Sequence, residues 1–371
     1  MVKGQIAARN HAKFYLEDGD VILQPYKDQI GGITLFCVHK GVLSFNSPVL
    51  RELFAKPPPG PKQPANNDAA IEKPLYHMKD SAQDLSEFLR AVYEPGTLLL
   101  PESAPDTPLR LAPIMKLAVK YQVASIQASV TDIMSRAWPQ SLSEWLDARA
   151  QRKLLEQKYT DAMNTADNYT GMLDGKHLAD RLPEPAAALR FAHDCGLHGV
   201  LPAAYYALAS VPAAKDWDEL QRASPDSFDD IHLRAARWSL LRPDEWRRLV
   251  RGREHLGRSV ALTLEAYGRT DEFEERLGDC CRGEASALAT RLRGGVLRNG
   301  AFDALLPDPI ELTQQLFEAV PSWGLCTSCT DTLQGDLRFA QECLWLEIPR
   351  AFTLGQSDAV PETGEGISVA L

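Results

Sequence analysis

No run of 18 or more apolar residues occurs in this chain, and its first residues contain no apolar stretch of the kind that a signal peptide requires. We therefore expect an intracellular protein, cytoplasmic or nuclear, with no membrane partner. An excess of positive charge is also missing, since the net charge is -10. A strong field that attracts nucleic acid is therefore not expected, and nucleic acid is not an expected partner.

The motifs that mark the common enzyme classes are missing as well. The sequence has no phosphate-binding loop, dinucleotide fingerprint, HExxH motif, EF-hand or serine elbow. It also has no period of 20–50 residues that would indicate a repeat array. We therefore predict a protein that is not an enzyme, with no catalytic residues and no cofactor apart from a structural zinc ion. Its 371 residues allow two or three domains.

What the chain does contain is a strand that leads directly into two short helices. Residues 33–38 form an apolar run of strand length, and helical spacing of apolar residues begins at Val42. Ser47 is a good helix N-cap, and Pro48 fits the first helical turn that follows it. The second helix places apolar side chains on one face, at Val49, Leu50, Leu53 and Phe54.

This order of strand, His-Lys step, helix, Ser-Pro step and helix resembles the centre of a BTB/POZ domain. The matching residues are Val38, His39, Lys40, Leu43, Ser47, Pro48 and Phe54. Residues 20–24 resemble the first strand of that family, and residues 117–123 resemble its late helix. The resemblance implies an α+β fold in which helices cap a small sheet, and a function in protein binding through helix faces and sheet edges.

The predicted organisation is an N-terminal BTB/POZ fold followed by a mainly α-helical C-terminal region. Its segments are a BTB/POZ domain at 1–138, with a polar lead-in at 1–18 and a mobile Pro-rich loop at 56–74, a polar connector at 139–182, helical regions at 183–260 and 261–354, and a disordered tail at 355–371. Apolar spacing predicts helices that include 81–93, 113–123, 125–137, 186–195, 202–210, 229–241 and 243–250, and a loop at 101–108.

The C-terminal region resembles the tail of a group of fungal, basidiomycete-like BTB proteins. The residues that carry this resemblance are Cys280 or Cys281, the step from Trp323 to Cys329, and residues 344–349 ahead of Phe352. Together with the N-terminal half, the resemblance covers most of the chain.

Cys326 and Cys329 have the CxxC spacing at which a tight turn brings two thiolates to one zinc ion. Zinc takes four ligands, and Cys281 is the third candidate. Because neighbouring side chains diverge, we expect at most one of Cys280 and Cys281 to bind. Two alternatives stay open: these cysteines are small, partly buried hydrophobes, or the CxxC pair has a redox role. Further donors are Cys280, Cys343 and, more distantly, His255.

The BTB/POZ resemblance implies an interaction protein, and the first function that we expect is that of a substrate adaptor for a cullin-3 ubiquitin ligase. A transcription or chromatin partner is one alternative, and a structural zinc-binding module at the C-terminal cysteines is another. A homodimer and a monomer both stay open, because the polar lead-in does not favour a swapped dimer. The candidate protein-binding residues are Asp20, His39, Lys40, Arg51, Glu52, Leu100 and Glu102.

The reasons for choosing these candidate residues differ. Lys40, Arg51 and Glu52 are expected on the exposed sides of the two short helices, where they would form the rim of an apolar groove. His39 is expected to be a structural histidine, hydrogen-bonded in the core. Residues 100–102 loosely fit the hydrophobic-x-Glu tripeptide that cullin-3 binders often present.

Residues 232–258 contain eight arginines, with Trp238 and Trp246 among them. A basic stripe with aromatic residues can contact nucleic acid. The tryptophans instead fit the buried face of a helix, because they are eight residues apart and in phase with Leu241 and Leu249. We therefore expect the arginines to lie on an outer face and to pair with acidic neighbours.

Overall fold

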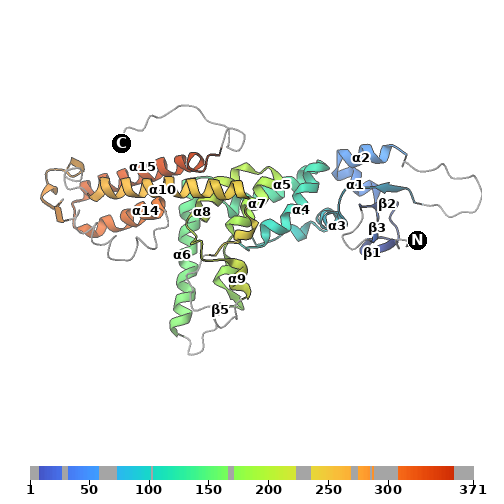
Figure 1. Cartoon of the computed structure of the whole chain (residues 1–371), viewed down its shortest axis with the longest axis horizontal. Helices are drawn as coiled ribbons and strands as arrows, with labels where there is room; N and C mark the ends of the chain where they lie inside the picture. The colour runs from blue at the N-terminus through green and yellow to red at the C-terminus, as the bar shows by residue number, and fades with distance from the viewer. Residues whose placement is uncertain are drawn as a thin grey trace, which may run out of the picture. The chain divides into compact units, whose positions relative to one another are not determined.

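The computed structural model describes residues 8–26, 32–57, 73–101, 103–165, 171–222, 235–268, 275–284, 286–287 and 308–354. As predicted, the structure is α+β: a mixed four-stranded sheet with helices is followed by a mainly helical region (Figure 1). The chain divides into two compact units, residues 1–102 with 107–134 and residues 103–106 with 135–371. Most of the predicted Pro-rich loop and the whole predicted tail lie outside the described residues.

The first unit is built on four strands, β1 (Ala8–Tyr15), β2 (Val21–Gln24), β3 (Ile33–Val38) and β4 (Leu75–His77), in the order β1-β3-β2-β4. β2 pairs antiparallel with β3, whereas β1 joins β3 and β4 joins β2 in parallel. The two central strands carry buried side chains because both are apolar runs. The two strands that the sequence analysis predicts at 20–24 and 33–38 are confirmed as β2 and β3.

The strand β1 is not predicted by the sequence, which indicates only a polar lead-in at 1–18. Within β1, Phe14 is the one buried side chain. An edge strand pairs through its backbone on one side, so it can form without the alternation of apolar and polar residues that identifies a strand. The lead-in prediction is therefore wrong for residues 8–15.

The helices of the first unit are α1 (Lys40–Asn46), α2 (Pro48–Ala55), α3 (Ala82–Tyr93), α4 (Thr107–Lys120) and α5 (Ala124–Ala137), the last of which spans the division at residue 134. The predicted N-cap at Ser47 is confirmed, since its hydroxyl oxygen accepts the Leu50 N–H at 3.0 Å. The same hydroxyl donates to the Tyr121 carbonyl at 2.6 Å. One side chain thus joins the start of α2 to the end of α4.

The helix α4 begins at Thr107 and not at Pro113, so the predicted loop at 101–108 is wrong at its end. Pro113 lies inside the helix, where proline costs about 3 kcal/mol because it removes a hydrogen bond and crowds the preceding turn. Buried side chains on both sides of the proline, among them Leu111 and Leu117, offset this cost.

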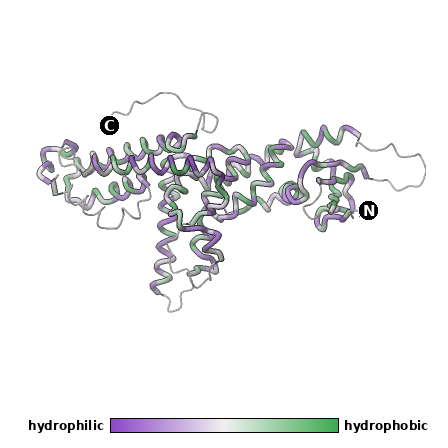
Figure 2. The backbone as a smooth tube through the Cα atoms, in the orientation of Figure 1, coloured by the Kyte–Doolittle hydropathy of each residue, from purple (hydrophilic) through white to green (hydrophobic). Residues whose placement is uncertain are grey.

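The second unit is mainly helical. Its principal elements are α6 (Leu142–Thr165), β5 (Met172–Leu173), β6 (Lys176–His177), α7 (Pro185–Cys195), α8 (Leu201–Ala209), α9 (Trp217–Arg222), α10 (Pro243–Gly268), α14 (Pro309–Ala319) and α15 (Thr327–Ala351). The predicted pair of helices around Gly196 is confirmed by α7 and α8, which pack together. α10, α14 and α15 pack against one another (Figure 1), and polar and apolar segments alternate along α10 and α15 (Figure 2).

The helix predicted at 229–241 is not formed in its described part, which begins at residue 235. This part makes a β-bridge at Ala236 and then a 3-10 turn. Trp238 and Trp246 therefore share no helix, and their rings instead stack at a centroid distance of 5.1 Å. Packing between the turn and α10 decides this conformation, which the spacing of the tryptophans does not reveal.

A network of charged side chains connects α6 to α14. The guanidinium of Arg149, which is 9% exposed, bonds to Glu311 through two of its nitrogens and donates to Glu318 at 3.0 Å through the third. Burial opposes the charged form of Glu311, but hydrogen bonds from Arg149 and Gln315 outweigh burial and lower the pKa of this carboxyl to about 2.

The end of α15 is fixed by Phe352, which is fully buried. Its ring stacks on Tyr205 of α8 at 5.1 Å and also lies against Gly252 of α10. A Cβ atom at Gly252 would lie 2.0 Å from this ring. The close approach of α10 to Phe352 therefore requires glycine at this position.

Replacing Arg149 by methionine should lower the free energy of unfolding by about 3 kcal/mol, because it leaves partly buried carboxylates without their partner. Urea denaturation of the full chain measures this change. Lys153→Met is the control, since Lys153 lies 3.5 Å from Glu311 but is 46% exposed and should contribute less than about 1 kcal/mol. Equal losses in the two variants would contradict a special role for the buried guanidinium.

The stability contributed by Glu311 should depend on pH. Its pKa of about 2 in the folded protein lies below its ordinary value of 4.5, so its contribution is present above about pH 4.5 and is lost as the pH falls toward 2. We expect the difference in unfolding free energy between wild type and Glu311→Gln to be constant near neutral pH and to shrink below about pH 4.5. A difference that stays constant down to about pH 3 would show that the carboxylate is not held in this way.

Gly252→Ala should lower the free energy of unfolding by about 2 kcal/mol, because the new methyl group displaces the Phe352 ring. Gly257 lies on the same helix with open space around it, so Gly257→Ala is the matched control. The control should raise the free energy by about 0.5–1 kcal/mol through helix propensity. Thermal unfolding of the two variants measures both signs, and stabilisation by both would refute the tight contact.

Candidate metal centre

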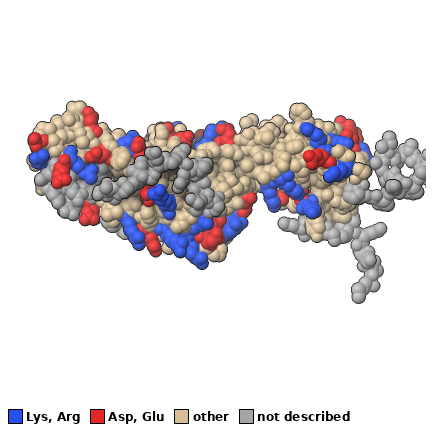
Figure 3. All heavy atoms as spheres, turned by 90° about the horizontal axis from the view of Figure 1, so that it is seen from above, with Lys and Arg blue, Asp and Glu red and all other residues tan. Residues whose placement is uncertain are grey.

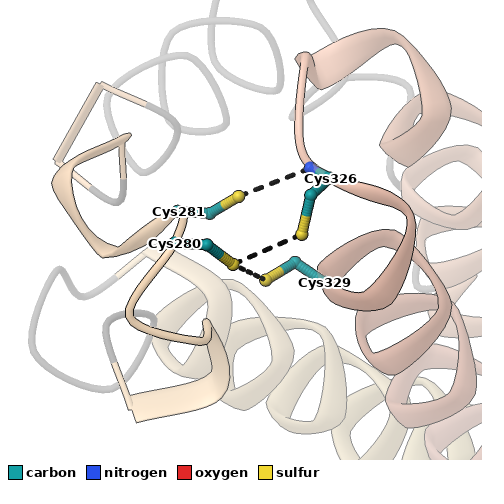
Figure 4. A group of neighbouring side chains, drawn as sticks. All are labelled: Cys280, Cys281, Cys326 and Cys329. Atoms are coloured by element: carbon teal, nitrogen blue, oxygen red, sulfur yellow. Dashed lines mark hydrogen bonds between the residues drawn. The ribbon is translucent and has the colours of Figure 1, made fainter.

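Four cysteine side chains from two segments that are far apart in the sequence meet at the start of α15 (Figure 4). They are Cys280, Cys281, Cys326 and Cys329, and we call them the sulfur cluster. Cys326 is the N-cap of α15, and Cys329 is the third residue of the helix. All four are free thiols.

Two local features bring the segments together. In the turn that precedes residues 282–284, the backbone N–H groups of Cys281 and Arg282 both bond to the Gly278 carbonyl, at 3.0 and 3.1 Å. On the other side, Gly324 adopts a left-handed backbone with a φ of 78° and reverses the chain ahead of α15. The tight turn and the helix start therefore face each other across the cluster.

The sulfur atoms lie at separations that suit a single metal ion. All four Sγ atoms are within 4.8 Å of one another. The Sγ of Cys280 lies 3.3 Å from that of Cys326 and 3.6 Å from that of Cys329 (Figure 4). A tetrahedral zinc ion with Zn–S bonds of about 2.3 Å holds its sulfur ligands about 3.8 Å apart. The separations are thus compatible with four ligands to one zinc ion.

Backbone N–H groups point at two of the sulfur atoms. Gly278 donates to the Sγ of Cys329 at 3.3 Å, and the N–H of Cys326 donates to the Sγ of Cys281 at 3.4 Å. The start of α15 adds the positive end of a helix dipole. Both effects favour the thiolate form of cysteine, which is the form that binds metals.

The thiols of the cluster differ in acidity. The backbone N–H of Cys329 and then the thiol of Cys280 lower the pKa of Cys326 to about 7. Hydrogen bonds to Cys326 and then to Cys329 raise the pKa of Cys280 to about 12. Cys326 is therefore more acidic than Cys280. A divalent cation can take the place of the thiol protons.

The cluster is half buried. Cys281 and Cys329 belong to an apolar core, whereas Cys280 and Cys326 are exposed. The other members of this core are Leu277, Leu316, Val320, Leu333 and Leu337, with Phe317, Trp323 and Leu325 packed against it. A metal ion can therefore enter from the solvent side and come to rest against a rigid apolar base.

Comparisons of the chain with protein-family models, with curated proteins and with solved structures find no match. The BTB/POZ resemblance therefore stays a prediction.

The structure brings together the three cysteines that the sequence predicts as zinc ligands, Cys326, Cys329 and Cys281, and adds Cys280 to them. The expectation that the side chains of Cys280 and Cys281 diverge is wrong, because the turn directs both sulfur atoms toward the start of α15 (Figure 4). The feature of the sequence that could have indicated Cys280 as a fourth ligand is its position directly beside Cys281. That the four residues bind zinc stays a prediction.

The two other donors considered from the sequence lie elsewhere. Cys343 is on α15, fourteen residues beyond Cys329, which corresponds to about 21 Å along a helix. His255 on α10 has its Nε2 atom 3.6 Å from Glu347, which lies still further along α15. Neither residue is part of the sulfur cluster.

In the first unit, several of the candidate protein-binding residues surround the start of α1. A carboxylate oxygen of Asp20 accepts the N–H of Lys40 at 2.6 Å. The ring of His39 lies between the hydroxyl of Tyr93, 3.3 Å from Nδ1, and the carboxylate of Asp18, 3.2 Å from Nε2. Asp20 and His39 therefore join β2, α1 and α3 by hydrogen bonds, as expected of a structural histidine at position 39, but the His39 side chain is 30% exposed and lies at the edge of the core, not within it.

The remaining candidates differ in exposure. Lys40, Arg51 and Glu52 are exposed, as expected, and Leu100 is partly buried. Glu102 lies outside the described residues. Within the part of the chain that the structure describes, no helix is both long and apolar enough to cross a membrane.

Acidic and basic side chains are interspersed on the face of the molecule that Figure 3 presents. Among the arginines of residues 232–258, Arg242 donates to Asp194 at 2.7 Å and Arg237 donates to Asp106 at 2.5 Å. Arg253 instead donates to the Val211 carbonyl at 2.6 Å. Arg242 and Arg237 thus pair with acidic residues as expected, whereas Arg253 does not, and Arg237, whose side chain is 13% exposed, does not lie on an outer face.

Proposed function

We propose that the protein is an interaction module of the BTB/POZ type and that it acts as a substrate adaptor for a cullin-3 ubiquitin ligase. The observation that carries this proposal is the order of elements in the first unit, in which β2, β3, α1, α2, β4, α3, α4 and α5 follow one another. The motif residues Asp20, His39 and Ser47 form hydrogen bonds that join these elements. Both facts support the resemblance on which the function rests.

The surface that we propose for partner binding is centred on Phe45 of α1, which is 84% exposed. The neighbouring Ser44 carbonyl accepts a hydrogen bond from the Nε of Arg51 at 2.9 Å. The Arg51 guanidinium is therefore attached to α1, and Lys40 and Glu52 are exposed on the same two helices. An apolar centre with a charged rim is the composition at which binding energy concentrates in protein interfaces.

Phe45→Ala should weaken the binding of the full chain to purified cullin-3 by about tenfold or more, because a central aromatic anchor is lost. Isothermal titration calorimetry measures the affinity. Phe339→Ala is the matched control, since Phe339 is also a largely exposed aromatic residue, 63% exposed, on α15 of the other unit. Both substitutions leave the core intact, so both variants should fold.

Two outcomes would contradict the proposal. If the wild-type chain does not bind cullin-3, the adaptor function should be abandoned. If it binds and Phe45→Ala binds equally well, the surface on α1 and α2 is not the contact region.

A further inference from the structure

We propose that the sulfur cluster binds one zinc ion through four thiolates, and that this ion fastens residues 275–284 to the start of α15. The zinc site does not depend on the interaction function, because all four ligands lie in the second unit, whereas the proposed partner surface lies in the first.

The donor set selects the class of metal. Four sulfur atoms that all lie within 4.8 Å of one another suit zinc, whereas magnesium and calcium require oxygen ligands. The separations of 3.3 and 3.6 Å from Cys280 are slightly shorter than the edge of about 3.8 Å in a zinc–sulfur tetrahedron. Small rotations of the cysteine side chains are enough to reach it, because none of the sulfur pairs is separated by more than 4.8 Å.

The binding reaction balances without a redox partner. Starting from four thiols, four S–H bonds break and their four protons pass to the solvent. Four Zn–S bonds form, and no atom changes its oxidation state. The complex carries a net charge of -2 from four thiolates and one Zn²⁺. The N–H groups of Gly278 and Cys326 already point at sulfur atoms of the cluster, and the start of α15 places a positive dipole end beside them.

The role of the ion is structural. Four protein ligands fill the coordination shell of zinc and leave no position for a substrate or a reactive water. In the described segment 275–284, the buried side chains are Leu277 and Cys281. Between the described residues of this segment and α15, the ion pair of Arg276 with Asp336 is 3.4 Å long and partly exposed. Zinc therefore supplies the main attachment of this segment.

The test is metal analysis of the full chain, purified without chelators and without an affinity tag that binds metals. We expect about one zinc ion per chain by plasma mass spectrometry. The variants Cys280→Ser and Cys326→Ser should each retain about a tenth of this amount or less after dialysis. Cys343→Ser is the matched control, because it removes a half-buried cysteine on α15 outside the cluster, and it should retain all of the zinc.

A second measurement covers variants that fail to fold. Cobalt(II) titrated into the metal-stripped wild-type chain should produce the near-ultraviolet thiolate-to-cobalt bands and the intense visible bands of a tetrahedral site. Hydrogen exchange should then show that residues 275–284 become protected when zinc is restored.

Several outcomes would overturn the inference. If the wild-type chain lacks metal, retains seven free thiols and gives no cobalt bands, the cluster is a packing feature. Iron or copper in place of zinc would refute the identity of the ion. Full zinc retention by Cys280→Ser would refute the four-thiolate ligand set, and recovery of the cysteines as disulfides without metal would indicate a redox pair.

Discussion

The placement of α15 is the constraint on which the second unit depends. This helix packs along α14 and α10 and also contacts α6 and α8. Both of its ends must therefore keep a fixed position relative to these helices. At its end, Phe352 occupies the space that Gly252 leaves open on α10 and stacks on Tyr205. At its start lies the sulfur cluster, which brings residues 280–281 onto the first turn of the helix.

The two ends of α15 are held by different physical means. Around Phe352 the packing is so close that a single added carbon atom would collide with the ring. Around Cys326 the apolar base is present, but the segment that covers it contributes few buried side chains. The metal ion that we propose for the four cysteines would provide strong, directional bonds at the place where apolar burial is thin. The charged network of Arg149 plays a comparable part between α6 and α14, since it joins two helices through bonds of fixed geometry.

In the first unit, side-chain hydrogen bonds join the strands and helices. Its short strands are joined by polar groups at the corners, where Asp20 meets the start of α1 and Ser47 links α2 with the end of α4. Phe45 itself is exposed on α1 and is not part of the buried core. A small domain that exposes a large aromatic side chain on a rigid helix is well suited to bind another protein.

The sequence by itself determined the features that depend on neighbouring residues. The central strands, the N-cap at Ser47 and the helix pair at Gly196 follow from local apolar spacing and capping chemistry, and the CxxC spacing pointed to half of the sulfur cluster. Only the tertiary structure decided the rest. The edge strand β1 depends on pairing with β3, and Pro113 is tolerated in α4 because the flanking side chains are buried. Cys280 lies beside Cys326, 46 residues away in the sequence, because a turn and the start of a helix meet there. The burial of apolar side chains from distant segments stabilises this contact, and local sequence patterns do not reveal it.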